Sequence, residues 1–126
     1  METKERKLEI SEIAGNFVNW RNNDEAQILR AALYSPDIES IEDGDTSEIG
    51  RVKGMAGLQK KGAGLSQHFE VHRIKASAPV VADNFFSVKF EIDTTDKKSG
   101  ERSILSEIGV YKVADGKIVK EHYFMW

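Results

Sequence analysis

Strict alternation of apolar and polar residues in the C-terminal half restricts this chain to a small set of folds. The segment NFFSVKFEIDTT is apolar at every second position, at Phe86, Val88, Phe90 and Ile92. That period of two is typical of a strand with one face in the core. Residues 104–113 and 118–126 also have strand character, and ADGK between them predicts a tight hairpin turn. We therefore expect antiparallel strands at the centre of the fold.

The N-terminal half has the pattern of helices. Apolar residues recur at helical spacing in residues 4–22 and again before Pro36, at Ile10, Ile13, Ala14, Phe17 and Val18, then Ala26, Leu29, Ala32 and Leu33. Residues 37–43 alternate as a short strand. A third helix is expected from residue 49, fraying after Leu58 because glycines weaken it. Residues 66–81 are expected to form one strand. Helices on one face of a mostly antiparallel, bent sheet make an α+β architecture.

Composition excludes several classes of protein. At 126 residues the chain is expected to be a single domain, residues 1–126. A net charge of −3 gives no support to a nucleic-acid or anionic-membrane partner, and no apolar run approaches the roughly 20 residues of a membrane span. The absence of cysteine excludes disulfides, thiol nucleophiles and thiolate metal sites. The charged segment METKERKLEI lacks the apolar core of a signal peptide, so a cytoplasmic location is expected.

Several segments together resemble the nuclear transport factor 2-like superfamily and, within it, SnoaL-like domain proteins. They are NFVNW in the first helix, LYSPDIESIE before the first strand, HFEVH and FSVKFEIDTTDKKSGER, and the final hairpin EIGVYKVADGKIVKEHYF. The resemblance covers nearly the whole chain, and the final hairpin is its most specific part. It implies a conical barrel of cystatin-like topology, with three N-terminal helices on a strongly curved, mostly antiparallel sheet and an apolar pocket at the open end.

Proteins of this superfamily use that pocket in different ways. Ketosteroid isomerase and SnoaL-type polyketide cyclases move protons with pocket carboxylates, scytalone dehydratase eliminates water, and the transport factor itself binds without catalysis. The fold by itself therefore leaves the function open.

The resemblance also implies site residues. It places the Glu107 face of segment 104–113 inward and Glu42 close to the general base of ketosteroid isomerase. Glu107 falls within one residue of that enzyme's oxyanion-stabilising acid, and His72 becomes a candidate for proton transfer. The isomerase tyrosine on the first helix is replaced by Asn16 or Phe17, so steroid isomerisation itself is not expected. The implied pocket side chains are Phe17, Trp20, Phe86, Val88, Phe90, Tyr111, Glu121 and Tyr123.

Two carboxyls in one enclosure could carry out acid–base chemistry. Burial raises the pKa of a carboxyl because its charged form loses hydration. A carboxylate can then remove a proton next to a carbonyl while a protonated partner hydrogen-bonds the enolate. The competing interpretation is that Glu42 lies in solvent, or that Glu107 lies at a rim or pairs with a neighbour such as Lys120 or Arg73.

Metal and nucleotide sites are not supported. His68 and His72 would suit zinc on a helix, but on the expected strand four residues span about 13 Å, too far for one ion. The glycine-rich segment lacks the lysine and hydroxyl residue that end a phosphate loop. We therefore expect neither a metal nor a cofactor.

Three functions remain open. The first is a cofactor-independent enzyme of the isomerase, cyclase or dehydratase type acting on a small apolar carbonyl compound. The second is a non-catalytic module that binds a small apolar ligand, and the third is a structural dimer. With the Glu107 face inward, the opposite face carries Ile104, Ile108 and Val110 and would need cover, so a homodimer through this outer sheet face is expected.

Overall fold

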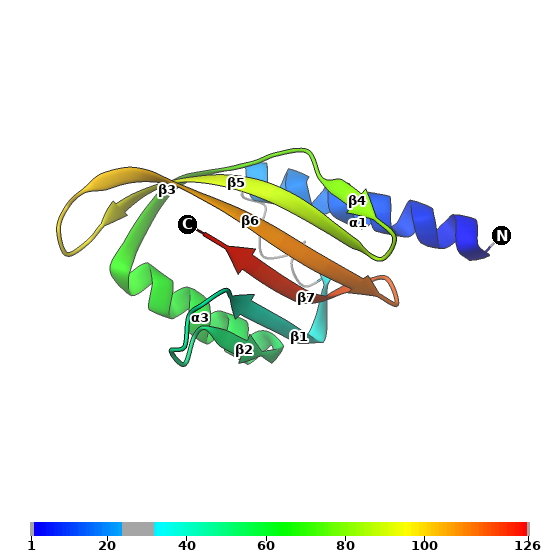
Figure 1. The fold of residues 1–126 in the computed structure, drawn as a ribbon, viewed down its shortest axis with the longest axis horizontal. Helices are drawn as coiled ribbons and strands as arrows, with labels where there is room; N and C mark the ends of the chain where they lie inside the picture. Colours follow the sequence, from blue (N-terminus) through cyan, green and yellow to red (C-terminus); the bar gives the residue numbers. More distant parts are fainter. Residues whose placement is uncertain (1, 24–31, 126) are drawn as a thin grey trace.

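The computed structural model describes residues 2–23 and 32–125, with side chains from Ile10 onward. Its strands form one seven-stranded sheet in the order β2-β1-β7-β6-β5-β3, and β4 pairs with β5 beside β3 (Figure 1). In chain order the described elements are α1 (Glu2–Asn23), β1 (Tyr34–Glu42), β2 (Arg51–Lys53), α3 (Gly54–His68), β3 (Phe69–Ala76), β4 (Val80–Ala82), β5 (Phe85–Asp96), β6 (Arg102–Ala114) and β7 (Lys117–Phe124). The α+β class is confirmed.

The sheet is mixed and open, which corrects the expectation of a barrel. Every described strand pair is antiparallel except β1 and β7, which run parallel. The strands at the two ends of the order, β2 and β3, do not pair with each other. Helix α3 contacts β1 and β2 at one end and continues into β3 at the other. Helix α3 therefore connects β2 and β3, the two edge strands that would be hydrogen-bonded to each other in a closed barrel.

Two of the three expected helices lie within the described residues. Helix α1 confirms the first, and both α1 and α3 pack on the same sheet face, since they contribute to one core. The second expected helix lies mostly over residues 24–31, outside the described part of the chain. None of the described helices is both long and apolar enough to span a membrane.

The glycine-rich segment was predicted wrongly at both ends. It begins as strand β2, and α3 then continues past Leu58 to His68, so residues 66–68 are helical. Residues 69–82 form two strands in place of the single strand expected. The glycines permit close packing: a Cβ at Gly57 would lie 3.1 Å from the Cβ of Val52, and one at Gly64 would lie 3.6 Å from the Ile49 side chain. Close packing outweighs the low helix propensity of these glycines.

The core lies between the helices and the inner face of the sheet. It consists of apolar and aromatic side chains from both helices and from most strands, including Ile10, Ala14, Phe17, Trp20, Ile38, Leu58, Phe86, Val88, Phe90, Tyr111 and Ile118. Phe17 is its hub: its ring centroid lies 4.4 Å from that of Tyr111 and 5.7 Å from that of Phe86. Burial of these rings fixes which face of β5 and β6 points inward.

The final hairpin follows the predicted register with one irregularity. Asp115 and Gly116 both have positive φ, as a tight Asp-Gly hairpin turn requires. A bulge between Lys112 and Val113 then shifts the pairing by one residue. Ile118 pairs with Val113 and is buried in the core, whereas Val119, which the shift leaves between the two pairings, is only half-buried. Beyond the bulge, Glu121 and Tyr123 lie opposite Tyr111 and Gly109.

Candidate functional site

Glu107 lies on the inner face of the sheet. It pairs directly with Phe90 of β5, a fully buried core residue, and Tyr111 further along β6 is also fully buried. Residues that face each other across an antiparallel pair point to the same side of the sheet. The inward orientation of Glu107 is therefore confirmed, and its carboxyl is half-buried.

The surroundings of Glu107 favour its neutral form. Burial raises the pKa of the Glu107 carboxyl to about 7, and the negative charge of Glu42 contributes to this rise. The positive charges of Arg21 and Lys61 oppose it, and Glu121 adds a smaller rise. Near neutral pH the carboxyl therefore exists in both protonation states, which suits a group that donates and accepts protons.

A second carboxyl, that of Glu121, is buried and fully engaged. Only 4% of the residue is exposed. The Tyr34 hydroxyl donates to Oε1 at 2.5 Å, and the Ser40 hydroxyl donates to Oε2 at 2.7 Å. Each carboxylate oxygen thus has a hydroxyl donor, which offsets the cost of burying the charge.

Lys61 of α3 connects Ser40, and through it Glu121, to Glu42. Its Nζ donates to the Ser40 hydroxyl at 2.7 Å and forms an ion pair with Oε1 of Glu42 at 2.8 Å. The lysine is 5% exposed, whereas about a quarter of the Glu42 side chain is exposed. We call the connected residues Tyr34, Ser40, Glu42, Lys61 and Glu121 the inner cluster.

Phenol groups border the inner cluster. The Tyr111 hydroxyl donates to that of Tyr123 at 3.2 Å, and Nζ of Lys61 lies 5.0 Å from the centre of the Tyr123 ring. Burial raises the pKa of Tyr34, Tyr111 and Tyr123 well above the ordinary value. All three therefore remain protonated hydrogen-bond donors at any pH near neutrality.

Local structure accounts for the convergence of these groups. In β1, Ile38, Ser40 and Glu42 share one face because strand side chains alternate, and the first two are fully buried. In α3, Lys61 follows buried Leu58 by three residues, so both lie on the face that packs on the sheet. The parallel pairing of β1 with β7 sets Ser40 beside Glu121.

The structure brings most of the predicted site residues to one face, but not all of them. Glu42 and Glu121 belong to the inner cluster, Tyr123 borders it, and Glu107 is close enough for the charges of Glu42 and Glu121 to raise its pKa. The predicted pocket side chains Phe17, Trp20, Phe86, Val88, Phe90 and Tyr111 are buried in the core around them.

His72 is placed apart from this group. It sits at the bulge between Val71 and Arg73, is exposed, and its Nε2 lies 2.6 Å from the Thr95 hydroxyl. His68, expected on a strand, instead ends α3. Among the described residues no group of three or more histidine and acidic side chains is placed to hold a metal ion.

The sequence prediction missed four polar residues of this face: Tyr34, Ser40, Lys61 and Arg21. Two of them were detectable. Ser40 shares strand parity with Glu42, and Lys61 interrupts the apolar stripe of α3 once that helix is extended to its full length. The other two depend on tertiary packing, because Tyr34 lies before the expected start of its strand and Arg21 lies on a helix end.

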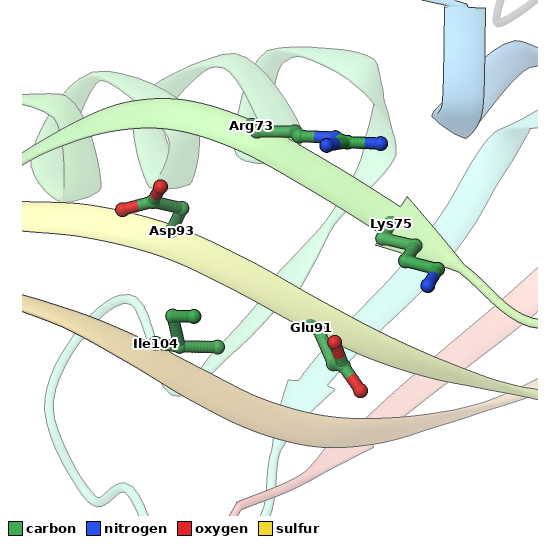
Figure 2. Close-up of a pocket in the computed structure, with 5 residues that line it drawn as sticks. All are labelled: Arg73, Lys75, Glu91, Asp93 and Ile104. Atoms are coloured by element: carbon green, nitrogen blue, oxygen red, sulfur yellow. The ribbon is translucent and has the colours of Figure 1, made fainter.

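The outer face of the sheet carries a different kind of hollow. It encloses about 230 Å³ and is lined by side chains of three neighbouring strands, Arg73, Lys75, Glu91, Asp93 and Ile104 (Figure 2). Arg102 donates two hydrogen bonds to Asp93, at 2.9 and 2.8 Å, and these lower the pKa of Asp93. The hollow combines two cations with two anions, so it offers no concentrated charge for a ligand.

The profile of the family described as SnoaL-like domain matches residues 8–125. No curated protein matches the chain. A solved structure of a candidate SnoaL-like polyketide cyclase from Mesorhizobium loti is 29% identical, with a TM-score of 0.83, and the match covers 91% of this chain and 97% of that one.

Two further solved structures share the fold at lower identity. A protein with cystatin-like fold from Xanthomonas campestris is 18% identical, with a TM-score of 0.71, covering 90% of this chain and 88% of its own. TerC, co-crystallised with polyporic acid, is 15% identical, with a TM-score of 0.72, covering 92% and 88% respectively. These two likenesses show the fold alone, and they confirm the cystatin-like topology.

Proposed function

The chain belongs to the SnoaL-like domain family, and from this premise we propose that it moves a proton on a small apolar carbonyl compound held against its inner sheet face. The reaction would be of the isomerase or cyclase type. One observation supports the proposal above all: two carboxyls of this face differ in state, since Glu42 is paired with a buried lysine whereas the pKa of Glu107 is raised to about 7. Such separation is how acid and base roles are assigned to chemically identical groups.

In the proposed step Glu42 is the base and Glu107 the acid. The free oxygen of the Glu42 carboxylate takes a proton from the carbon next to the carbonyl. The electron pair of the broken C–H bond moves onto the carbonyl oxygen as an enolate, to which the protonated Glu107 donates a hydrogen bond. In a substrate with a carbon–carbon double bond next to the acidic carbon, the enolate is a dienolate, and return of the proton from Glu42 to its far carbon gives an isomer. In a substrate with a second carbonyl, the enolate carbon adds to that carbonyl and closes a ring, and the alkoxide that forms takes the proton back from Glu42.

Similar proteins support the ligand class. The Mesorhizobium loti protein is named as a candidate polyketide cyclase, and TerC was co-crystallised with polyporic acid. The core around the two glutamates is largely aromatic, which suits an apolar ring compound.

A non-catalytic binding module is the second candidate, and the Lys61 ion pair favours it. One oxygen of Glu42 is held by this buried ammonium at 2.8 Å, so it is engaged in an ion pair and not available to a substrate. Under this alternative the inner cluster is a structural network and the face binds the same class of ligand unchanged.

We also propose that two copies associate through the outer face of the sheet. Ile104 and Ile108 are 67% and 49% exposed there, and both lie on β6 in the middle of the sheet. Large apolar residues exposed on the same face of a central strand are usually covered by a partner.

Deuterium exchange of an enolisable ketone tests the catalytic proposal. Unlabelled 1-indanone is incubated with the protein in D₂O, and incorporation next to the carbonyl is followed by NMR. We expect deuterium incorporation to be faster with the protein than in buffer. Glu42→Gln should lower the rate of incorporation by about 10²-fold or more. Glu107→Ala should lower it by a comparable factor, and Glu107→Gln should lower it less. Glu39→Gln, on the same strand but the opposite face, is the control and should behave as the original protein.

The outcomes separate the candidates. Binding of the ketone without accelerated exchange supports the non-catalytic module. If exchange is accelerated but Glu42→Gln and Glu107→Ala leave it unchanged, the roles given to the two carboxyls are wrong.

A further inference from the structure

Arg21 is the cation of the inner face that the proposed chemistry does not use. It lies in the last turn of α1, and its guanidinium carbon is 5.2 Å from the centre of the Trp20 ring and 5.5 Å from that of Phe90. Phe90 is the direct cross-strand partner of Glu107. The guanidinium therefore lies over the same part of the inner face as the carboxyl proposed to act as the acid.

One buried hydrogen-bond donor of Arg21 has no partner within the described part of the chain. Its Nε is buried and has no hydrogen-bond partner, and no described carboxylate forms an ion pair with its guanidinium. Lys61 differs in this respect, because its ammonium contacts both Ser40 and Glu42. A buried donor without a partner destabilises the state that contains it, so a ligand that supplies an acceptor binds favourably.

Two features of the surroundings of Arg21 indicate which ligand group would accept its hydrogen bonds. A guanidinium presents parallel N–H groups that match the two oxygens of a carboxylate, and the flanking rings hold it in one plane. The rings also provide an apolar wall beside the charge, so a ligand that combines a ring with one anionic group satisfies both.

We propose that Arg21 binds a carboxylate of the ligand, and that the compound held on the inner face is a small apolar carbonyl compound carrying one such group. The carbonyl part of this statement rests on the proposed function. The carboxylate part rests on the position of Arg21. With the carboxylate at Arg21, the rest of the ligand extends from the guanidinium toward Glu107, the cross-strand partner of Phe90.

A pair of matched probes tests the proposal. The dissociation constants of 2-naphthylacetate and of its neutral amide, 2-naphthylacetamide, are measured by titration calorimetry. The indole N–H signal of Trp20, identified by Trp20→Phe, reports whether binding occurs beside Arg21. We expect the acid to bind at least about tenfold more tightly than the amide. Arg21→Met should remove this preference and leave binding of the amide unchanged.

Two further variants separate charge from packing. Arg73→Met removes the same charge from the exposed outer hollow and should retain the full preference for the acid. Arg21→Lys keeps the positive charge but lacks the planar guanidinium, so it should retain part of the preference for the acid over the amide. This variant tests the proposal even if Arg21→Met folds poorly.

Equal affinity for acid and amide in the original protein would overturn the assignment of Arg21 while leaving the proposed function intact. A preference that survives in Arg21→Met would overturn it as well. Failure of both probes to perturb Trp20 would contradict the ligand-binding face itself, and the two proposals would then fall together.

Discussion

Replacing Glu107 with glutamine should change the dependence of stability on pH in a predictable direction. The pKa of Glu107 in the folded protein is about 7, against an ordinary value of 4.5. A raised pKa means that the folded state holds the proton more tightly than the unfolded state. The stabilisation from the neutral carboxyl is therefore complete below pH 4.5 and is lost as the pH rises through 7.

The size of the effect follows from the same two values. Each pKa unit corresponds to about 1.4 kcal/mol, so a rise from 4.5 to about 7 costs the folded protein about 3 kcal/mol above pH 8. Glu107→Gln cannot ionise and avoids this cost. We expect its free energy of unfolding, relative to that of the original protein, to rise by up to about 3 kcal/mol between pH 4.5 and pH 8.

Urea denaturation at intervals from pH 4.5 to 8.5 measures this difference, and a carbon-detected NMR titration of the Glu107 carboxyl gives the pKa directly. Asp93→Asn is the control with the opposite sign. Because Arg102 lowers the pKa of Asp93, its stabilisation is lost as the pH falls, and the variant should match the original protein most closely in acid. A pH-independent difference for Glu107→Gln, with a pKa near 4.5, would place the carboxyl in water and refute the acid–base proposal.

Three other predictions test single contacts, two of them by urea denaturation and the third by sedimentation. Lys61→Met leaves the Glu42 carboxylate without its ion-pair partner and should lower the free energy of unfolding by about 3 kcal/mol. Lys60→Met removes only an exposed ion pair with Glu48 and should lower it by less than about 1 kcal/mol. Gly109→Ala places a Cβ 2.4 Å from a tyrosine hydroxyl in the core and should cost about 1–3 kcal/mol, whereas Gly15→Ala, with open space around it, should stabilise α1 by up to about 1 kcal/mol. Ile108→Glu should convert the proposed dimer to a monomer in sedimentation velocity; an unchanged distribution would contradict an interface on this face.

The parts of the fold that follow from period-two alternation were predictable from the sequence. The inward face of β5 follows from it, and the Asp-Gly dipeptide predicted the turn at Asp115 and Gly116. The inward orientation of Glu107 came from the family resemblance, because both faces of β6 are largely apolar. Where a bulge shifts the pairing, as between Ile118 and Lys120 in β7, alternation alone gives the wrong side. The extent of α3 could not be predicted from helix propensity, because its glycines are required for contact with residues outside the helix such as Val52.

The site was predictable to the same limited extent. Strand parity grouped Glu107 with Leu105 and Tyr111, and the family resemblance then placed that face inward and identified Glu42. The partner that fixes the Glu42 carboxylate, Lys61, comes from a helix that was expected to fray before reaching it. His72 was nominated by its place in a motif, but a bulge left it on an exposed stretch of β3. Residues brought together by tertiary packing are not encoded in local periodicity.

The two proposals are linked through the charges around Glu107. The negative charges of Glu42 and Glu121 raise its pKa, and the positive charges of Arg21 and Lys61 lower it. A ligand carboxylate bound to Arg21 would cancel part of the lowering influence and place another negative charge nearby. The pKa of Glu107 should therefore rise further in the complex, and by linkage the ligand should bind more tightly to the protonated form. An NMR titration of the Glu107 carboxyl with saturating 2-naphthylacetate measures the first effect, with the neutral amide as the control. A rise with 2-naphthylacetate alone would mean that ligand binding itself favours the protonated form of Glu107. Equal pKa values in both complexes would mean that the contact at Arg21 does not influence Glu107.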